Sequence, residues 1–307
     1  MLQKIFFDQV NTFSGIFSLI SMDRLELESG ISEEKTMKLQ RILSLTLALA
    51  ISLITIESSS SAQTTRTYQQ MTASERTAFV REQAQRIARQ MSGTDYQFTD
   101  PFAMEIQNSV DAYVQRIGNN NAGLGKSDPR FILERGQTLA PTLISIFKAR
   151  EVSPLIGLYI PWIESAYINV QSPNPRGAIG MFQFLPQTGE HFGLTRQELQ
   201  DVEKSADAAA RYIAASINTF KDDPMKEALA LLAYNRGAQK TAQDLKVLIN
   251  DQNKQCSICA LTADRSKLDE RFREENVFYV PRFFAAAIIG ENPLAFGLQI
   301  QPLSSNQ

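Results

Sequence analysis

The spacing of apolar residues from Thr72 onward is the feature that most limits the fold. In one segment these residues recur every three or four positions, at Phe102, Ile106, Val110, Tyr113 and Ile117. This spacing places them on one face of a helix. The sequence has no sustained run of alternating β-branched residues and no repeat of fixed period. We therefore expect an all-α protein.

Local signals divide this pattern into helices. Ser74 can cap a first helix, and Asp128-Pro129 and Ser153-Pro154 each place a capping residue before a proline at the first helical position. The stretch 118–125 is rich in asparagine and glycine, and 171–180 holds prolines and glycines, so both are predicted to be loops. Further helices are expected over residues 128–150, 155–165, 186–191, 205–220, 224–235, 238–249 and 275–290.

The N-terminal part of the sequence has the pattern of an export signal. The uncharged apolar run 42–56 is shorter than the roughly 20 residues of a membrane span. Basic residues after Met37 precede it, and small residues ending at Ala62 follow it, as in a cleaved signal peptide. We expect translation to start at Met37 and cleavage to follow Ala62, which gives an exported, periplasmic protein. The alternative is a start at Met1 with an uncleaved membrane anchor.

Three segments follow from these boundaries. Residues 1–62 form the upstream extension and signal peptide, 63–125 a linker and helical extension, and 126–307 the main domain. The net charge of −2 does not favour a nucleic-acid binder, which usually carries a basic excess. The single histidine, His191, leaves little room for histidine-based triads or metal centres. An enzyme with this composition would use carboxylates or backbone groups.

Glu164 is the carboxylate that stands out. It ends an apolar helical segment, so partial burial and the negative end of the helix dipole should both raise its pKa. A glutamic acid that stays protonated near neutral pH can act as a general acid. No other Asp or Glu occurs from Ser165 to Gly189. Taken alone, a glutamate at a helix end is more often a solvated surface residue, and the surrounding motifs make the difference.

Four separated motifs accompany it in a fixed order: Glu164-Ser165, Gly177-Ala178-Ile179-Gly180-Met181-Phe182-Gln183, Tyr234-Asn235-Arg236-Gly237 and Glu275-Asn276-Val277-Phe278-Tyr279-Val280. Together they resemble the lytic transglycosylases with a goose-lysozyme-like catalytic domain, and most closely the membrane-bound lytic transglycosylase D branch. The resemblance covers about residues 139–298. It implies a lysozyme-like helical catalytic domain that acts on the glycan strands of peptidoglycan, with no cofactor and no metal. Partners that assemble the cell envelope are a further possibility that the resemblance leaves open.

The resemblance also implies a reaction. Glu164 would protonate the glycosidic oxygen between N-acetylmuramic acid and N-acetylglucosamine, with an oxocarbenium-like centre at the sugar carbon. The resulting carboxylate would then take the proton of the sugar's 6-hydroxyl, and a 1,6-anhydro ring would close. Since the nucleophile belongs to the substrate, one carboxyl group suffices. The alternatives are a hydrolase of goose-lysozyme type and a cell-wall binding or assembly protein that retains the groove without activity.

Site roles follow from the same resemblance. Ser172, Gln183, Glu275 and Tyr279 would bind the glycan, and Tyr234 would do so while hydrogen-bonding near Glu164 and helping to set its pKa. Both tyrosines could equally be ordinary core residues. Structural roles are expected for the backbone of the glycine-containing motifs, at Gly177, Ala178, Gly180, Met181, Asn235 and Gly237. Glycines 177 and 180 are expected to need positive φ or close backbone approach.

Two departures from the family pattern and one cysteine pair remain. The link 173–176 is longer than usual, which affects the placement of Ser172, and Asn276 stands where threonine is usual. Cys256 and Cys259 lie in a polar stretch without the second pair that a zinc site would need. In an exported chain, a local disulfide is the favoured interpretation over zinc or redox chemistry. Serine at both positions should leave activity largely intact.

Overall fold

The computed structural model describes residues 66–249 and 254–306. The predicted signal peptide, the start at Met37 and the cleavage after Ala62 lie outside the described residues. Within the described part, no helix combines the length and the apolar character that crossing a membrane requires.

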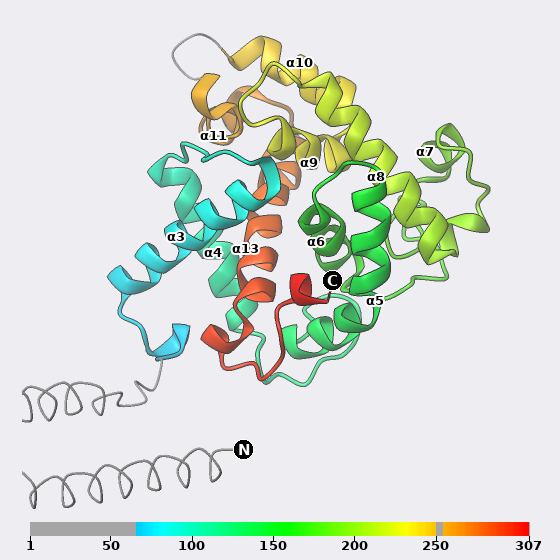
Figure 1. The fold of residues 1–307 in the computed structure, drawn as a ribbon. Helices are drawn as coiled ribbons and strands as arrows, with labels where there is room; N and C mark the ends of the chain where they lie inside the picture. Colours follow the sequence, from blue (N-terminus) through cyan, green and yellow to red (C-terminus); the bar gives the residue numbers. More distant parts are fainter. Residues whose placement is uncertain (1–65, 250–253, 307) are drawn as a thin grey trace, which may run out of the picture. The chain divides into compact units, whose positions relative to one another are not determined.

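The elements are helices joined by loops and short 3-10 turns (Figure 1). The described residues contain no β-strand beyond an isolated bridge between Ile179 and Phe184, which confirms the all-α prediction. The α-helices are α3 (Ala73–Ser92), α4 (Asp100–Val114), α5 (Pro129–Ala149), α6 (Pro154–Ser165), α7 (Pro186–His191), α8 (Val202–Thr219), α9 (Lys226–Arg236), α10 (Ala238–Leu248), α11 (Ser257–Ala263), α12 (Glu270–Glu274) and α13 (Tyr279–Glu291).

The helix ends follow local hydrogen bonding. The Asp128 side chain accepts a hydrogen bond from the Arg130 amide and caps α5, as predicted. The prediction that Ser74 caps the first helix was wrong. Thr72 is the cap, because its side chain accepts a hydrogen bond from the Glu75 amide and the Glu75 carboxylate accepts one from the Thr72 amide, a capping box.

The last helix and the stretch before it also differ from the sequence prediction. Residues 276–278 form a 3-10 turn, so α13 begins at Tyr279 rather than at 275. The stretch around the cysteine pair, described from the sequence only as polar, contains α11, and α12 begins at Glu270. Both helices are short, and segments of one or two turns carry too few positions for a clear helical period.

Helix α13 is the centre of the fold. Every residue in it except Arg282 is buried, and it packs against α3, α4, α6 and α9 (Figure 1). Because α3 and α4 belong to the predicted N-terminal extension, the extension and the main domain contribute to one continuous apolar core. The C-terminal end of α6 and the N-terminal end of α13 meet within this core, and together they carry the candidate site.

Candidate functional site

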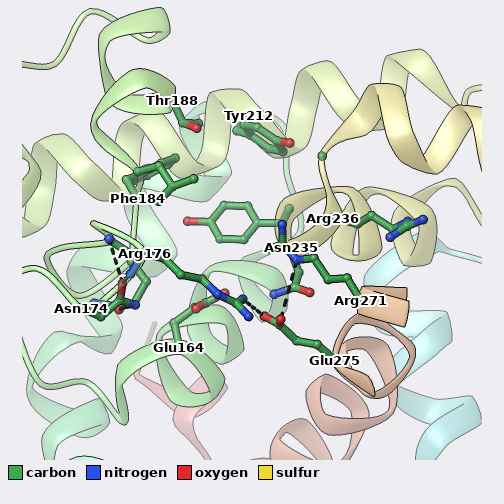
Figure 2. Close-up of a pocket in the computed structure, with 15 residues that line it drawn as sticks. Glu164, Asn174, Arg176, Phe184, Thr188, Tyr212, Asn235, Arg236, Arg271 and Glu275 are labelled. Atoms are coloured by element: carbon green, nitrogen blue, oxygen red, sulfur yellow. Dashed lines mark hydrogen bonds and ion pairs between the residues drawn. The ribbon is translucent and has the colours of Figure 1, made fainter. Parts of the chain in front are cut away.

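Glu164 lies in the last turn of α6. The helix ends there because Ala166 and Tyr167 adopt left-handed backbone conformations, with φ of 53° and 57°. Most of α6 is buried, and the side chain of Glu164 is partly exposed to a groove (Figure 2). This Glu164 groove is lined by Glu164, Asn174, Arg176, Ala178, Gln183, Phe184, Leu185, Thr188, Tyr212, Tyr234, Asn235, Arg236, Gly237, Arg271 and Glu275.

The carboxyl group of Glu164 has a strongly perturbed proton affinity. Burial raises its pKa to about 7, the Tyr279 hydroxyl opposes this rise by donating a hydrogen bond to Oε1 at 2.7 Å, and the negative charge of Glu275 adds to it. A hydrogen bond to a carboxylate favours the ionised form, whereas a nearby like charge disfavours it. The direction agrees with the rise predicted from the sequence. A carboxyl group with a pKa of about 7 can donate a proton near neutral pH and, once ionised, accept one.

Glu275 is the other carboxylate of the groove, and two arginines hold it. Arg176 Nη1 lies 2.5 Å from Oε1, and Arg271 Nε lies 3.7 Å from Oε2 (Figure 2). The carboxylate is thus engaged in ion pairs, whereas Glu164 has only a neutral hydroxyl donor among its described hydrogen-bond partners. Sequence reasoning missed both arginines. Arg176 belongs to the unusually long link 173–176, so that departure from the family pattern was the signal that could have pointed to it.

The glycine motif forms a tight loop against α6. Gly177 and Gly180 have φ of 88° and 78°, and a Cβ on Gly180 would lie 2.1 Å from the carbonyl oxygen of Leu199. Both expected reasons for glycine, positive φ and close backbone approach, therefore occur at Gly180. Ala178 and Met181 are buried. The Ser165 hydroxyl donates to the Met181 carbonyl at 2.8 Å, which ties this loop to the helix turn that carries Glu164.

The predicted binding residue Gln183 lies in the groove, but Ser172 does not. Gln183 donates to the Gly180 carbonyl at 2.8 Å and accepts from Asn174 Nδ2 at 3.2 Å. Ser172 is exposed in the preceding loop and is absent from the groove lining. The structure places Asn174 there instead, because its side chain accepts from the amides of Arg176 and Ala178 and closes the turn of the long link.

The hydroxyl groups of Tyr234 and Tyr279 make hydrogen bonds that differ from those that the sequence suggested. The expected hydrogen bond of Tyr234 near the catalytic carboxyl is directed to the backbone, from its hydroxyl to the Phe182 carbonyl at 2.8 Å. Tyr279, expected to bind the glycan, makes the direct contact with Glu164. The correction has a simple geometric cause. Tyr279 is the first residue of α13, which abuts α6, while the Tyr234 ring packs against Tyr212 and Phe184 with centroid distances of 5.4 and 5.7 Å.

A buried polar network lies behind the end of α9. Asn235 accepts a hydrogen bond from Asn276 Nδ2 at 2.6 Å, and the Asn276 side-chain oxygen accepts from Arg236 at 2.9 Å. Arg236 also forms ion pairs with buried Asp244 and with Asp269. Asn276, in the position where threonine is usual, thus links Asn235 to a buried arginine. Gly237 follows with φ of 90° and connects α9 to α10.

The cysteine pair lies away from the groove lining. The sulfur atoms of Cys256 and Cys259 are 1.95 Å apart in a disulfide at the start of α11, and both residues are buried. Within residues 66–249 and 254–306, no group of three or more His, Cys, Asp or Glu side chains is arranged to hold a metal ion. The chemistry that the groove itself offers is proton transfer at Glu164.

Comparisons with known proteins give the following picture. Residues 143–255 match the model of the transglycosylase SLT domain family, a range that contains Glu164, the glycine motif and Tyr234. A search of curated proteins finds no match. Among solved structures, the chain is similar to an inactive mutant of the lytic transglycosylase Slt from Pseudomonas aeruginosa, with 23% identity and a TM-score of 0.39. That similarity covers 53% of this chain and 25% of the other, so the chain spans only a part of that protein's length. The family match covers less than half of the chain.

Proposed function

We propose that this protein is a lytic transglycosylase that cleaves the bond between N-acetylmuramic acid and N-acetylglucosamine in peptidoglycan and leaves a 1,6-anhydro end. The observation that carries the proposal is the carboxyl group of Glu164, which lines the groove without an ion-pair partner among the described residues and has a pKa of about 7 raised chiefly by burial. The SLT domain match and the four ordered motifs supply the substrate class. The sequence motifs also favour the membrane-bound lytic transglycosylase D branch.

The reaction uses Glu164 twice. Its protonated carboxyl gives the proton to the glycosidic oxygen as the bond from that oxygen to C1 of N-acetylmuramic acid breaks. The 6-hydroxyl of the same sugar then bonds to C1, and its proton passes to the carboxylate of Glu164. Glu164 donates one proton and accepts one, so the enzyme returns to its starting state and no water is consumed.

The neighbours of Glu164 support this double role. Tyr279 donates a hydrogen bond that favours the carboxylate formed after the first proton transfer. Glu275, the other groove carboxylate, is held by Arg176 and Arg271 and contributes negative charge rather than a free base. Gln183 offers an amide group for neutral sugar substituents, and we assign it, together with Glu275, to glycan binding.

The location proposed from the sequence fits this substrate. Peptidoglycan lies outside the cytoplasm, and residues 37–62 have the pattern of a cleaved signal peptide. We therefore propose an exported, periplasmic protein. Mass spectrometry of the exported chain tests this, since an N-terminus upstream of Met37 contradicts the cleaved signal.

The decisive experiment is digestion of purified peptidoglycan, with the products weighed by mass spectrometry. A transglycosylase gives muropeptides lighter by one water than the reducing ends that a goose-type hydrolase makes. Glu164→Gln should abolish turnover while the circular dichroism spectrum and binding to peptidoglycan persist, because the amide keeps the size of the side chain but cannot donate the proton. Products with reducing ends would support the hydrolase. Absence of cleavage by the unaltered protein, with binding retained, would support the non-catalytic alternative.

A further inference from the structure

A second hollow adjoins the candidate site, and the N-terminal extension forms much of it. Its lining includes Tyr113 of α4, Arg116 just beyond α4, and Phe278 and Arg282 at the start of α13. Ile163, which also lines it, directly precedes Glu164. Phe278 in the same way directly precedes Tyr279. Ile163 and Glu164 thus divide between this α4 hollow and the Glu164 groove, and Phe278 stands next to the residue that donates a hydrogen bond to Glu164.

The α4 hollow has a surplus of positive charge. The guanidinium carbon of Arg116 lies 4.9 Å from the Tyr113 ring centroid, and that of Arg282 lies 5.7 Å from the Phe278 ring centroid. Neither arginine forms an ion pair with a carboxylate of the described residues. An arginine that rests on an aromatic face keeps its N–H edges available for bidentate contact with a carboxylate.

The other charges and donors around the hollow reinforce this surplus. Glu105 is the one acidic residue in the lining, and its carboxylate is already paired with Arg265 at 3.0 Å. Burial raises the pKa of the Tyr113 hydroxyl, and the positive charges of Arg116 and Arg282 oppose that rise. Both guanidinium groups are therefore close enough to act on the same hydroxyl. Arg282 is the only exposed residue of α13, and every other residue of that helix is buried. An exposed arginine at that position has no role in the core.

We propose that the α4 hollow binds a carboxylate of the short peptides attached to the glycan strands. The proposal rests on the proposed function, because peptidoglycan supplies the ligand. The sugars of the strand carry mainly neutral groups, whereas the attached peptides carry free carboxylates. A strand bound with its scissile bond at Glu164 would bring a neighbouring peptide to the hollow beside it. The extension would then contribute to substrate selection.

The kinetic test compares two substrates for the full chain: peptide-bearing strands and strands from which an amidase has removed the peptides. We expect the unaltered protein to have a KM about fivefold lower for peptide-bearing strands, the size of a partly exposed charge pair. The double variant Arg116→Gln, Arg282→Gln should lose this preference. Arg196 is an exposed arginine outside both hollows that has no ion pair with the described residues, and Arg196→Gln should keep the preference. A preference that persists in the double variant, or is absent from the unaltered protein, overturns the proposal.

A binding test separates this proposal from the proposed activity. The full chain with Glu164→Gln is titrated, by calorimetry, with the free cell-wall tetrapeptide and with the same peptide amidated at every carboxyl group. We expect binding of the carboxylate form alone, with at least fivefold weaker binding when Arg116→Gln and Arg282→Gln are added. Equal binding of both peptides, or equal binding by both proteins, overturns the hollow as a carboxylate site. If the chain cleaves no glycan but this binding pattern appears, the proposed activity fails and the carboxylate site stands.

Discussion

The hydrogen bond from Tyr279 to Glu164 gives the sharpest test of how the groove sets its proton affinity. Tyr279→Phe removes the hydroxyl and keeps the ring. The lost bond is 2.7 Å long and its acceptor is a carboxylate, a class worth about 1.5–3 kcal/mol. One pKa unit corresponds to about 1.36 kcal/mol, so the pKa of Glu164 should rise by about one to two above its value of about 7.

The sign of the effect on activity follows from the role of Glu164 as an acid. The free enzyme needs the protonated carboxyl, so kcat/KM should fall as pH rises through about 7 in the unaltered protein. In Tyr279→Phe the same fall in kcat/KM should occur about one to two pH units higher. At low pH, where both proteins are protonated, kcat should be about tenfold lower in the variant, because the carboxylate formed in the reaction has lost a donor. Release of soluble muropeptides, measured across pH, gives both quantities.

Tyr234→Phe is the matched control. Its hydroxyl lies in the same groove but donates to the Phe182 carbonyl. This variant removes a hydroxyl without removing a donor to Glu164, so kcat/KM should fall at the same pH as in the unaltered protein. The reasoning is refuted if the fall in Tyr279→Phe stays in place or moves to lower pH. It is equally refuted if both tyrosine variants shift it by the same amount.

Two further predictions concern stability. Arg236→Ala should lower the free energy of unfolding by about 3–5 kcal/mol in urea titrations, because its buried partner Asp244 would remain as an unpaired charge. Arg176→Ala is the control: its ion pair is largely exposed, so the loss should be less than about 1 kcal/mol. Gly180→Ala should sharply reduce the yield of folded, active protein because its Cβ would clash with a backbone carbonyl. Gly193→Ala, with nearly the same φ but no atom within 4 Å, should cost only about 1–2 kcal/mol in the same titrations; equal losses for the two would contradict the steric explanation.

The sequence predicted the helices best where several signals agreed. The aspartate and proline that begin α5, and the apolar period of α4, specify both the type and the approximate position of those helices. The helical spans within 250–271 were missed because α11 and α12 are too short to show a period. Helix starts were less certain, since Thr72 and Ser74 can both cap and only the hydrogen bond to Glu75 decides between them.

In the candidate site, position in the chain predicted the acid but not its partners. The motifs around Glu164 identified it as the candidate acid, and the apolar helix that it ends predicted the direction of its pKa shift. Its hydrogen-bond donor could not be identified, because Tyr279 lies 115 positions away and reaches it only through the packing of α13 on α6. The arginines that hold Glu275 are similarly distant or lie in the long link. Such contacts depend on tertiary packing, which residue spacing does not encode.

The enclosure of α13 has a consequence for cooperativity. This helix carries Tyr279 at its first turn, and α3 and α4 from one part of the chain and α6 and α9 from another cover its remaining faces. Loss of the extension would expose the largely apolar α13 to water, and its first turn would lose the support that keeps Tyr279 against Glu164. Residues 66–306 should therefore melt as a single calorimetric unit, and a mutation far away in α4 can change the acidity of Glu164 simply by loosening α13.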